Sequence, residues 1–336
     1  MPPKRRRAVA SPRAPSKQVR VAVVAHSGKT FGGGLEELRA VLARAGHPRP
    51  LWFEVPKSVV ARRAVRRALK KGATVVFAWG GDGLVQTCID ALAGSGVSLA
   101  ILPAGTANLL ATTLGIPQHI AKAVRIGLRG QARLLDVGVM NGERFAVMAG
   151  TGLDALIMNH VSRGEKERFS RLAYVRSGVK AMQADRVRMK VRVDGEVWFK
   201  GKASNLLVGN VGTLAGGITV FPEASVSDGK LEIGAVTAKT PWQWLRVFTR
   251  AAVGLVARSP YVRKTTGKKI SVRLDRRSPY ELDGGARPRT KRIKVHVEPG
   301  ALRVCAPVAG QGRSSRQALR RPRAAAGQNL PMSARP

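Results

Sequence analysis

Apolar residues form short, uninterrupted runs along the first third of the chain, and glycine-rich turns and amphipathic segments separate these runs. The runs are VRVAVVAH (residues 19–26), LWFEV (51–55), TVVFAW (74–79) and VSLAILP (97–103). The segments between them, such as LEELRAVLARAG, have apolar residues at helical spacing and end at glycine. Strands that are apolar on both faces are typical of a parallel sheet covered by helices. We therefore expect a Rossmann-like α/β domain over residues 20–135.

The pattern changes after about residue 135, where short strands and turns dominate. Runs such as LLDVGVM, RFAVMAG, SNLLVGN, KLEIGAV, RIKVHVE and ALRVCAP predict a mostly antiparallel β domain over residues 136–300. Two segments, near residues 155–184 and 241–257, have helical spacing. In RVRMKVRV the basic residues Arg186, Arg188, Lys190 and Arg192 alternate with apolar ones, which places all four cations on one strand face.

The charge balance is extreme and points to an anionic partner. The 336 residues include 59 Lys plus Arg against 20 Asp plus Glu, a net charge of +39. Basic, polar ends predict disordered tails at residues 1–19 and 311–336. The chain between the ends still carries about +26. Such a chain is expected to associate with nucleic acid, anionic lipid or phosphorylated small molecules.

The cysteine spacing and the lack of long apolar stretches argue against several classes of protein. Cys88 and Cys305 lie far apart with no CxxC motif, which argues against a zinc site or a disulfide framework. We expect no signal peptide, because no long apolar stretch follows the basic start. No window of about 18–20 residues is free of charge, so no membrane-spanning helix is expected. These features predict a cytoplasmic protein, peripheral at the inner face of the membrane.

One turn carries the strongest chemical signal. Its residues are Gly80, Gly81, Asp82 and Gly83, placed between the run TVVFAW and a helical pattern. Glycines let a ligand approach the backbone, and the start of a helix offers free N–H groups to phosphate. A carboxylate beside phosphates can help to hold a cation. The alternative is a simple Asp-Gly turn. We favour a nucleotide site because a helix, not a second strand, follows.

A second strand–loop–helix junction follows about two dozen residues later. In PAGTANLLA, Gly105 offers open backbone and Thr106 a hydroxyl to the same ligand, and Asn108 is a candidate helix cap. Strands of a parallel sheet present such loops at their carboxyl ends. The earlier SGKT resembles the end of a phosphate-binding P-loop. However, Val23 stands where that motif needs its first glycine, so we reject that interpretation.

The ordered set GGDG, PAGTAN, GTGLDA, PEASVSDGKLE and LDGG resembles the diacylglycerol kinase catalytic family over about residues 20–308. The resemblance implies an ATP-binding α/β domain, a C-terminal β-sandwich that binds the lipid, and a cleft between them. It implies that the final strand, residues 301–310, returns to the first domain. It places ATP on Gly80, Gly81, Asp82, Gly83 and Thr106, with Gly105 alongside. A structural Mg²⁺ is implied at Asp228, with backbone oxygens of Ser225 and Lys230.

The chain departs from the family pattern at positions that matter for catalysis. Leu84, Gln86 and Thr87 replace the usual residues after GGDG, and Gly285 stands where the family has its general-base glutamate. Asp283 is the best remaining candidate for that base, and Asp82 is the other expected catalytic residue. Glu281 ranks second to Asp283.

The expected function is transfer of the γ-phosphate of Mg-ATP to a lipid hydroxyl, with diacylglycerol favoured. A NAD kinase-like enzyme and a catalytically weak, nucleotide-dependent membrane binder are the alternatives. The segment TPWQWLRVFTRAAVGLVARSPYVRK (residues 240–264) fits either an interfacial helix or an ordinary packed helix. The expected partners are a lipid substrate and an anionic membrane surface. No specific nucleic acid is expected, since the chain has no recognised DNA-binding motif, and the prediction allows for a homodimer.

Overall fold

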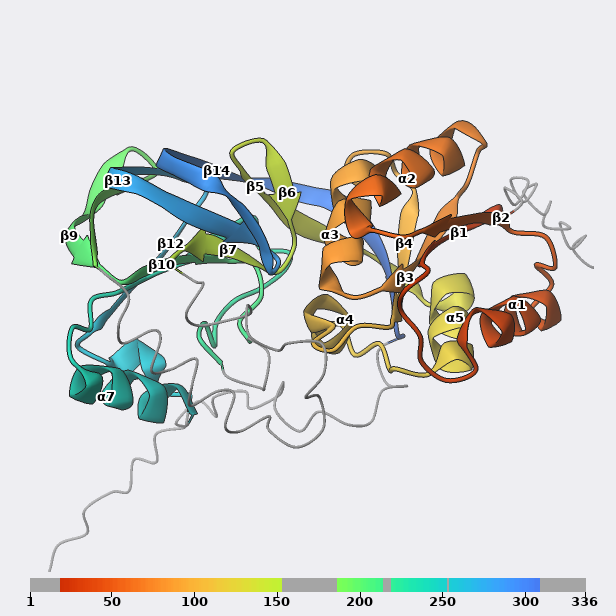
Figure 1. Ribbon diagram of the computed structural model, residues 1–336, viewed down its shortest axis with the longest axis horizontal. Helices are drawn as coiled ribbons and strands as arrows, with labels where there is room; N and C mark the ends of the chain where they lie inside the picture. The colour runs from red at the N-terminus through yellow and green to blue at the C-terminus, as the bar shows by residue number, and fades with distance from the viewer. Residues whose placement is uncertain (1–18, 153–185, 214–218, 253, 309–336) are drawn as a thin grey trace, which may run out of the picture.

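The computed structural model describes residues 19–152, 186–213, 219–252 and 254–308, and Figure 1 shows two halves joined side by side. The two basic tails and the helix expected near residues 155–184 lie outside these ranges. Asp154, in the GTGLDA motif, also lies outside them.

The N-terminal half is the expected parallel sheet with helices on both faces. Its strands run in the order β4–β3–β1–β2 and all pair in parallel. They are β1 (Val21–His26), β2 (Leu51–Val55), β3 (Val75–Gly80) and β4 (Ser98–Pro103). The helices are α1 (Gly34–Arg44), α2 (Ala61–Lys70), α3 (Asp82–Leu92), α4 (Leu109–Thr113) and α5 (Ile120–Arg129), with a 3₁₀ turn η1 (Ser58–Val60). Figure 1 places α2 and α3 on one face of the sheet and α1 and α5 on the other.

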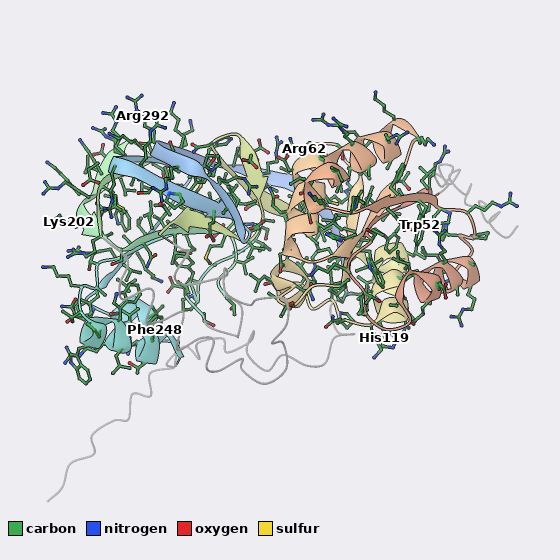
Figure 2. The ribbon with its side chains drawn as sticks, in the orientation of Figure 1. Trp52, Arg62, His119, Lys202, Phe248 and Arg292 are labelled. Carbon is green, nitrogen blue, oxygen red and sulfur yellow. The ribbon has the colours of Figure 1, made fainter. Side chains whose placement is uncertain are left out.

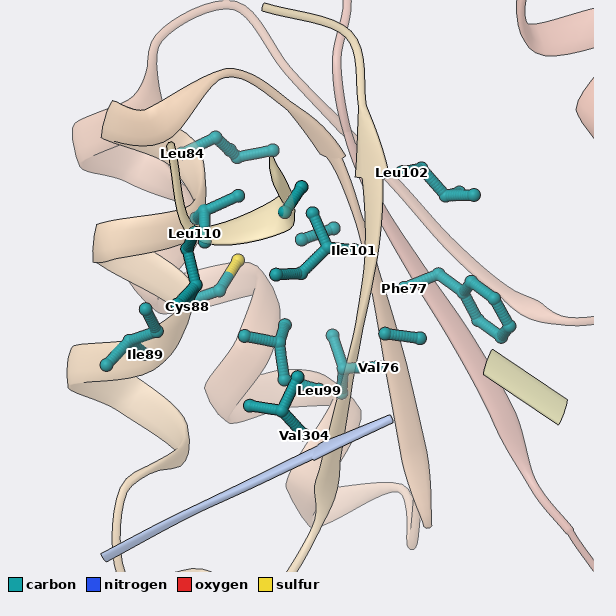
Figure 3. Close-up of a cluster of buried hydrophobic side chains, with 14 of the residues drawn as sticks. Val76, Phe77, Leu84, Cys88, Ile89, Leu99, Ile101, Leu102, Leu110 and Val304 are labelled. Atoms are coloured by element: carbon teal, nitrogen blue, oxygen red, sulfur yellow. The ribbon is translucent and has the colours of Figure 1, made fainter. Parts of the chain in front are cut away.

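Helix α3 is fixed to the sheet by buried aliphatic side chains. Figure 3 shows Leu84 and Cys88 of α3 facing Leu99 and Ile101 of β4, with Val304 from the far end of the chain beside them. All five are almost fully buried. Burying a Leu, Ile or Val side chain stabilises a fold by roughly 1.5–3 kcal/mol. The start of α3, which carries the GGDG turn, therefore has a rigid base.

The C-terminal half is an antiparallel β-sandwich. One layer contains β5 (Gln131–Met140), β6 (Glu143–Phe145), β8 (Val187–Val193), β9 (Glu196–Ala203), β13 (Lys269–Leu282) and β14 (Gly285–Ala306). The other contains β7 (Met148–Thr151), β10 (Asn205–Gly209), β11 (Leu231–Val236) and β12 (Val262–Gly267). Buried side chains such as Val191, Ile233 and Val272 fill the space between the layers.

Strand β14 connects the two halves into one sheet. It pairs antiparallel with β13 and β5 of the sandwich, and its last residues pair in parallel with β4. In that last segment Arg303 lies beside Ser98, and Val304 lies beside Leu99. The strand expected to return to the first half is therefore present. It is the end of a 22-residue strand that also contains the run RIKVHVE.

Two expectations about the strands were wrong in detail, and one helix was not expected. RFAVMAG is not one strand but two, β6 and β7, and the Asp283 carboxylate accepts the N–H groups of the two residues between them, Ala146 and Val147. RIKVHVE and ALRVCAP are one strand with a bulge between Glu298 and Leu302. Helix α5 was not anticipated at all.

The alternating cations of β8 lie on the exposed side of the sandwich, as the pattern predicted. Strand register extends them into a row of like charges across four strands, here named the cation row. It consists of Lys200 on β9, Lys190 on β8, Arg273 on β13 and Arg292 on β14. Figure 2 labels Arg292 at the upper edge of this half, among many nitrogen-tipped side chains. Like charges directly opposite one another destabilise a sheet.

Helix α7 (Pro241–Ala252) packs on the other layer, close to the 3₁₀ turn η4 (Val256–Arg258). Its Trp244, Val247 and Ala251 are buried in a small separate core. Across the described residues, helices are too short or too polar to cross a membrane.

Candidate functional site

The two glycine loops meet at the carboxyl edge of the parallel sheet. Strands β3 and β4 end side by side, with Gly80 beside Pro103, and the Ala104 N–H donates to the Gly80 carbonyl at 2.9 Å. Beyond this point the backbones of Gly81 and Gly105 are in contact. A Cβ atom added to Gly105 would lie 2.5 Å from the Gly81 Cα. Only glycine fits here, so the sequence brings the two loops together without side chains between them.

Asp82 links these loops through both of its carboxylate oxygens. Oδ2 accepts the Asn108 N–H at 2.9 Å, and Oδ1 accepts the Leu109 N–H at 2.7 Å. The side chain thus caps the start of α4 from a different part of the chain. Burial raises the pKa of the Asp82 carboxyl, and these two N–H groups oppose the rise. The sequence indicated a carboxylate beside phosphate, and the structure adds that it fixes the PAGTAN loop.

Asn108 does not cap α4 with its side chain, contrary to one expectation. It adopts a left-handed conformation with φ of 48°. Its side chain closes the loop on itself, because Oδ1 accepts the Gly105 N–H and Nδ2 donates to the Gly105 carbonyl, both at 2.9 Å. Thr106, between them, is left exposed. The loop is therefore rigid, and its one hydroxyl faces outward.

The start of α3 offers unpaired backbone donors beside this loop. Gly81 precedes the helix and has no side chain to cap it. Among the described residues, no hydrogen-bond acceptor is found for the Gly83 N–H. Free N–H groups and the positive end of the helix dipole attract phosphate. The backbone at the start of α3 therefore keeps a donor that the described chain does not use.

The SGKT loop closes the same edge from β1. The indole Nε1 of Trp79 donates to the Lys29 carbonyl at 2.9 Å, and the Phe31 ring stacks on Trp79 at 4.6 Å. His26 ends β1, and its Nδ1 accepts the Gly28 N–H at 3.1 Å. Burial and the nearby Lys29 charge lower the His26 pKa, which favours a neutral imidazole. Aromatic packing therefore holds this loop in place. It does not have the form of a P-loop wrapped around phosphate.

Asp283 lies at the turn between β13 and β14 and is buried. Its Oδ1 accepts the N–H groups of Val147 and Met148 at 3.0 and 2.8 Å, and its Oδ2 accepts that of Ala146 at 3.0 Å. Burial raises the pKa of Asp283 to about 6 against these three donors, and the negative charge of Asp82 raises it further. The two expected catalytic carboxylates, one from each half, are thus close enough to interact electrostatically.

Gly285, two residues further on, has an arginine in front of it. A Cβ atom at this position would lie 2.8 Å from Nη1 of Arg287. That nitrogen donates to the Gly285 carbonyl at 3.0 Å, and the guanidinium also forms a bidentate ion pair with Glu143 at 2.9 Å. A flexible cation therefore lies where a side chain at residue 285 would begin. Glu281, the second candidate base, is buried in β13.

The expected magnesium loop is ordered by an aspartate that sequence reasoning missed. Asp136 is buried in β5, where its carboxylate accepts the N–H groups of Gly229 at 2.6 Å and Gly300 at 2.8 Å. Within the loop, Asp228 Oδ1 accepts the Lys230 N–H at 3.1 Å. An acidic residue inside the apolar run LLDVGVM was the signal available in the sequence.

The loop contains the one carboxylate and the two carbonyls that the family resemblance implies for magnesium. Mg²⁺ commonly binds one or two carboxylates and completes its shell with carbonyls and water. Asp228 supplies one carboxylate, the Ser225 and Lys230 carbonyls lie in the same loop, and no group of three or more acidic, His or Cys ligands occurs among the described residues.

The halves are also joined by charged and amide side chains that the sequence did not reveal as a group. The guanidinium of Arg144 in β6 forms a bidentate pair with Glu298 at 2.7 and 3.0 Å. The backbone N–H of Arg144 donates to the Asp90 carboxylate of α3 at 3.2 Å. Gln86 of α3 donates to the Arg144 carbonyl at 2.7 Å. One of the departures after GGDG therefore has a structural role, since it anchors α3 to the sandwich.

Family models, related sequences and solved structures all indicate the same family. The family described as the diacylglycerol kinase catalytic domain matches residues 19–140, and the YegS C-terminal NAD kinase beta sandwich-like domain matches residues 147–306. A probable lipid kinase YegS-like from Pseudomonas aeruginosa (strain UCBPP-PA14) is 31% identical over 304 residues, covering 86% of this chain and 94% of that protein. A diacylglycerol kinase from Bacillus subtilis (strain 168) is 27% identical over 228 residues, covering 67% and 75% respectively.

The fold agrees with these relatives. A crystal structure of a diacylglycerol kinase from Bacillus anthracis superposes with a TM-score of 0.70 at 22% identity, covering 87% of this chain and 98% of that one. The matched families span both halves and the strand that joins them. With its glycine loops, its β-sandwich and a relative of nearly the same extent, the chain belongs to the diacylglycerol kinase catalytic family of lipid kinases.

Proposed function

We propose that the chain transfers the γ-phosphate of Mg-ATP to a lipid hydroxyl, with diacylglycerol as the favoured acceptor. The observation that carries this proposal is the contact of the Gly81 and Gly105 backbones at the start of α3, which Asp82 fixes from both oxygens. This arrangement offers a phosphate chain free N–H groups and close backbone approach. Thr106 offers it a hydroxyl. The favoured acceptor also rests on the name of the Bacillus subtilis relative.

In the proposed reaction, the lipid hydroxyl oxygen attacks the γ-phosphorus in line, the bond from that phosphorus to the bridging oxygen breaks, and ADP leaves. Such transfer depends mainly on positioning and charge neutralisation. We assign Asp283 as the group that accepts the hydroxyl proton, because a carboxylate with a pKa of about 6 is ionised at neutral pH. Its three backbone donors hold it in one orientation, although they occupy part of its accepting capacity.

Magnesium would serve two purposes in this proposal. At the nucleotide it would neutralise phosphate charge, and Asp82 is the carboxylate placed to help hold it. In the sandwich it would bind Asp228 with the Ser225 and Lys230 carbonyls and stabilise that loop.

We also propose that the protein works as a peripheral protein at the inner face of the membrane. A net charge of +39 favours an anionic leaflet, where each nearby Lys or Arg contributes about 1 kcal/mol. A homodimer stays a prediction.

The test is transfer itself. Purified protein, labelled ATP and Mg²⁺ are incubated with a total lipid extract, with diacylglycerol alone and with NAD. The expected product is a phosphorylated lipid from the extract and phosphatidic acid from diacylglycerol. Label in the NAD product instead would favour the NAD kinase alternative, and label in no lipid would leave a nucleotide-dependent binder.

A further inference from the structure

Helix α7 has an apolar face that nothing in the described chain covers. Trp244 and Val247 point into the small core, but Trp242 is 62% exposed and Leu245 is 45% exposed. These two residues are three apart and therefore neighbours on one side of the helix. An exposed patch of a large aromatic ring and a leucine on a highly charged protein indicates a contact surface for an apolar partner.

The chain on either side of this face is basic. Residues 237–258, which include α7 and η4, contain four Lys or Arg and no acidic residue. The Arg246 guanidinium lies 5.6 Å from the Trp242 ring centroid, and Lys239, just before the helix, is exposed. An apolar pair framed by cations matches the boundary between acyl chains and anionic headgroups.

Helix α7 lies on the same side of the molecule as α4, which follows the second glycine loop. In Figure 1, α7 and α4 both lie along the lower edge, whereas the layer with the cation row lies along the upper edge. In Figure 2, Phe248 of α7 and His119 beside α5 are labelled on that same lower side. A membrane held against α7 would therefore present lipid on the side of the glycine loops.

We propose that Trp242, Leu245, Arg246 and Lys239, here named the docking face, bind an anionic lipid bilayer. Trp242 and Leu245 enter the headgroup boundary, where an indole ring is favoured, and the two cations contact lipid phosphates. The docking face rests on the proposed lipid kinase function for its purpose, since it would bring the site to its substrate. Its physical test does not require catalysis.

The test compares binding to vesicles of phosphatidylglycerol mixed with phosphatidylcholine against binding to phosphatidylcholine alone. The double variant Trp242→Ser, Leu245→Ser is expected to bind the anionic vesicles at least about ten-fold more weakly. Arg246→Gln should weaken binding about five-fold, the loss of one cation near an anionic leaflet. The matched control is Leu134→Ser, Val197→Ser, which removes apolar residues 57% and 46% exposed in other strands and should change binding less than two-fold.

A spectroscopic readout places the helix in the bilayer directly. Vesicles with brominated acyl chains should quench tryptophan fluorescence, and Trp242→Phe should remove most of that quenching. Circular dichroism checks that each variant is folded. Wild-type binding by the double variant overturns the docking face, and so does equal weakening of the matched control. If substitutions in the cation row release the protein while the double variant stays bound, the opposite side is the membrane surface.

Catalytic assays separate this proposal from the proposed function. On vesicles, turnover by the double variant relative to its turnover on a short-chain, water-soluble diacylglycerol is expected to fall about ten-fold. An unchanged ratio contradicts the docking face. If the wild type transfers phosphate to neither substrate yet needs Trp242 and Leu245 to bind vesicles, the proposed function fails and the docking face stands.

Discussion

Asp283 is a buried carboxylate whose titration should be visible in the stability of the whole protein. Burial raises its pKa from an ordinary value of 3.8 to about 6, against three N–H donors. Since a tenfold change in proton affinity is worth about 1.36 kcal/mol, ionising this group costs the folded state about 3 kcal/mol. The folded pKa lies above the unfolded one, so the unfolded chain loses the proton first as pH rises. Stability from this group is therefore complete below about pH 4 and is lost by about pH 6.

The measurement is urea unfolding at pH 4 and pH 7 for the wild type and Asp283→Asn. Asparagine does not titrate. Its side-chain NH₂ group would face the Ala146 N–H, which is also a donor, so one hydrogen bond is lost and the variant should be less stable at pH 4. Because all other groups titrate equally in both proteins, the difference in free energy of unfolding isolates Asp283. We expect the free energy of unfolding of the wild type, minus that of the variant, to fall by about 2 kcal/mol between pH 4 and pH 7.

The same experiment separates a proton role from a purely structural one. A difference that stays constant with pH would refute the buried ionising carboxylate. In the wild type, transfer should rise as pH increases through about 6, because the base must be ionised. If transfer is independent of pH over this range while the stability difference moves as expected, Asp283 holds the strand end and another group takes the proton.

Three further predictions concern the glycine loops, the position of Gly285 and the cation row. Gly105→Ala should weaken ATP binding at least ten-fold by calorimetry, because its methyl group would force the loop away from Gly81. Gly201→Ala, whose Cβ would make only ordinary contact with the Phe199 ring at 3.4 Å, is the control and should bind normally. Gly285→Glu should raise turnover several-fold once Arg287 gives way. An unchanged rate would show that no base is missing. Raising NaCl from about 20 to 300 mM should raise the melting temperature, because salt screens the cation row; a constant melting temperature in salt would contradict that repulsion.

The parallel sheet could be predicted from the sequence because three of its four strands, β1, β3 and β4, are largely buried apolar runs with a turn at the end. The two glycine loops were predictable for the same reason, since parallel strands place their carboxyl ends at one edge. Helix α5 escaped notice because Gly127 interrupts its pattern, at a position where the buried Phe77 ring packs against it. The sequence alone gave no sign of that contact.

The site residues that were missed act across long stretches of chain. Asp136 accepts N–H groups 93 and 164 residues away, and Asp82 caps a helix 27 residues further on. A single sequence shows which residue types are present but not which backbone donors a buried carboxylate will meet. The split of RFAVMAG into two strands has the same origin, since Asp283 lies 135–137 residues away from the N–H groups it takes.

The pairing of β4 with the end of β14 has a consequence for how this protein is made. Strand β4 ends at Pro103, but its outer neighbour, Arg303–Val304, is about 200 residues further along the chain. At synthesis rates of about 5–20 residues per second, the ribosome needs roughly 10–40 s to deliver it. Throughout that interval the nascent N-terminal half carries an open, apolar strand edge, which is a template for pairing with other chains. Chaperone demand during translation should therefore concentrate on β4, and a premature stop before residue 302 should leave an aggregating fragment rather than a stable N-terminal half.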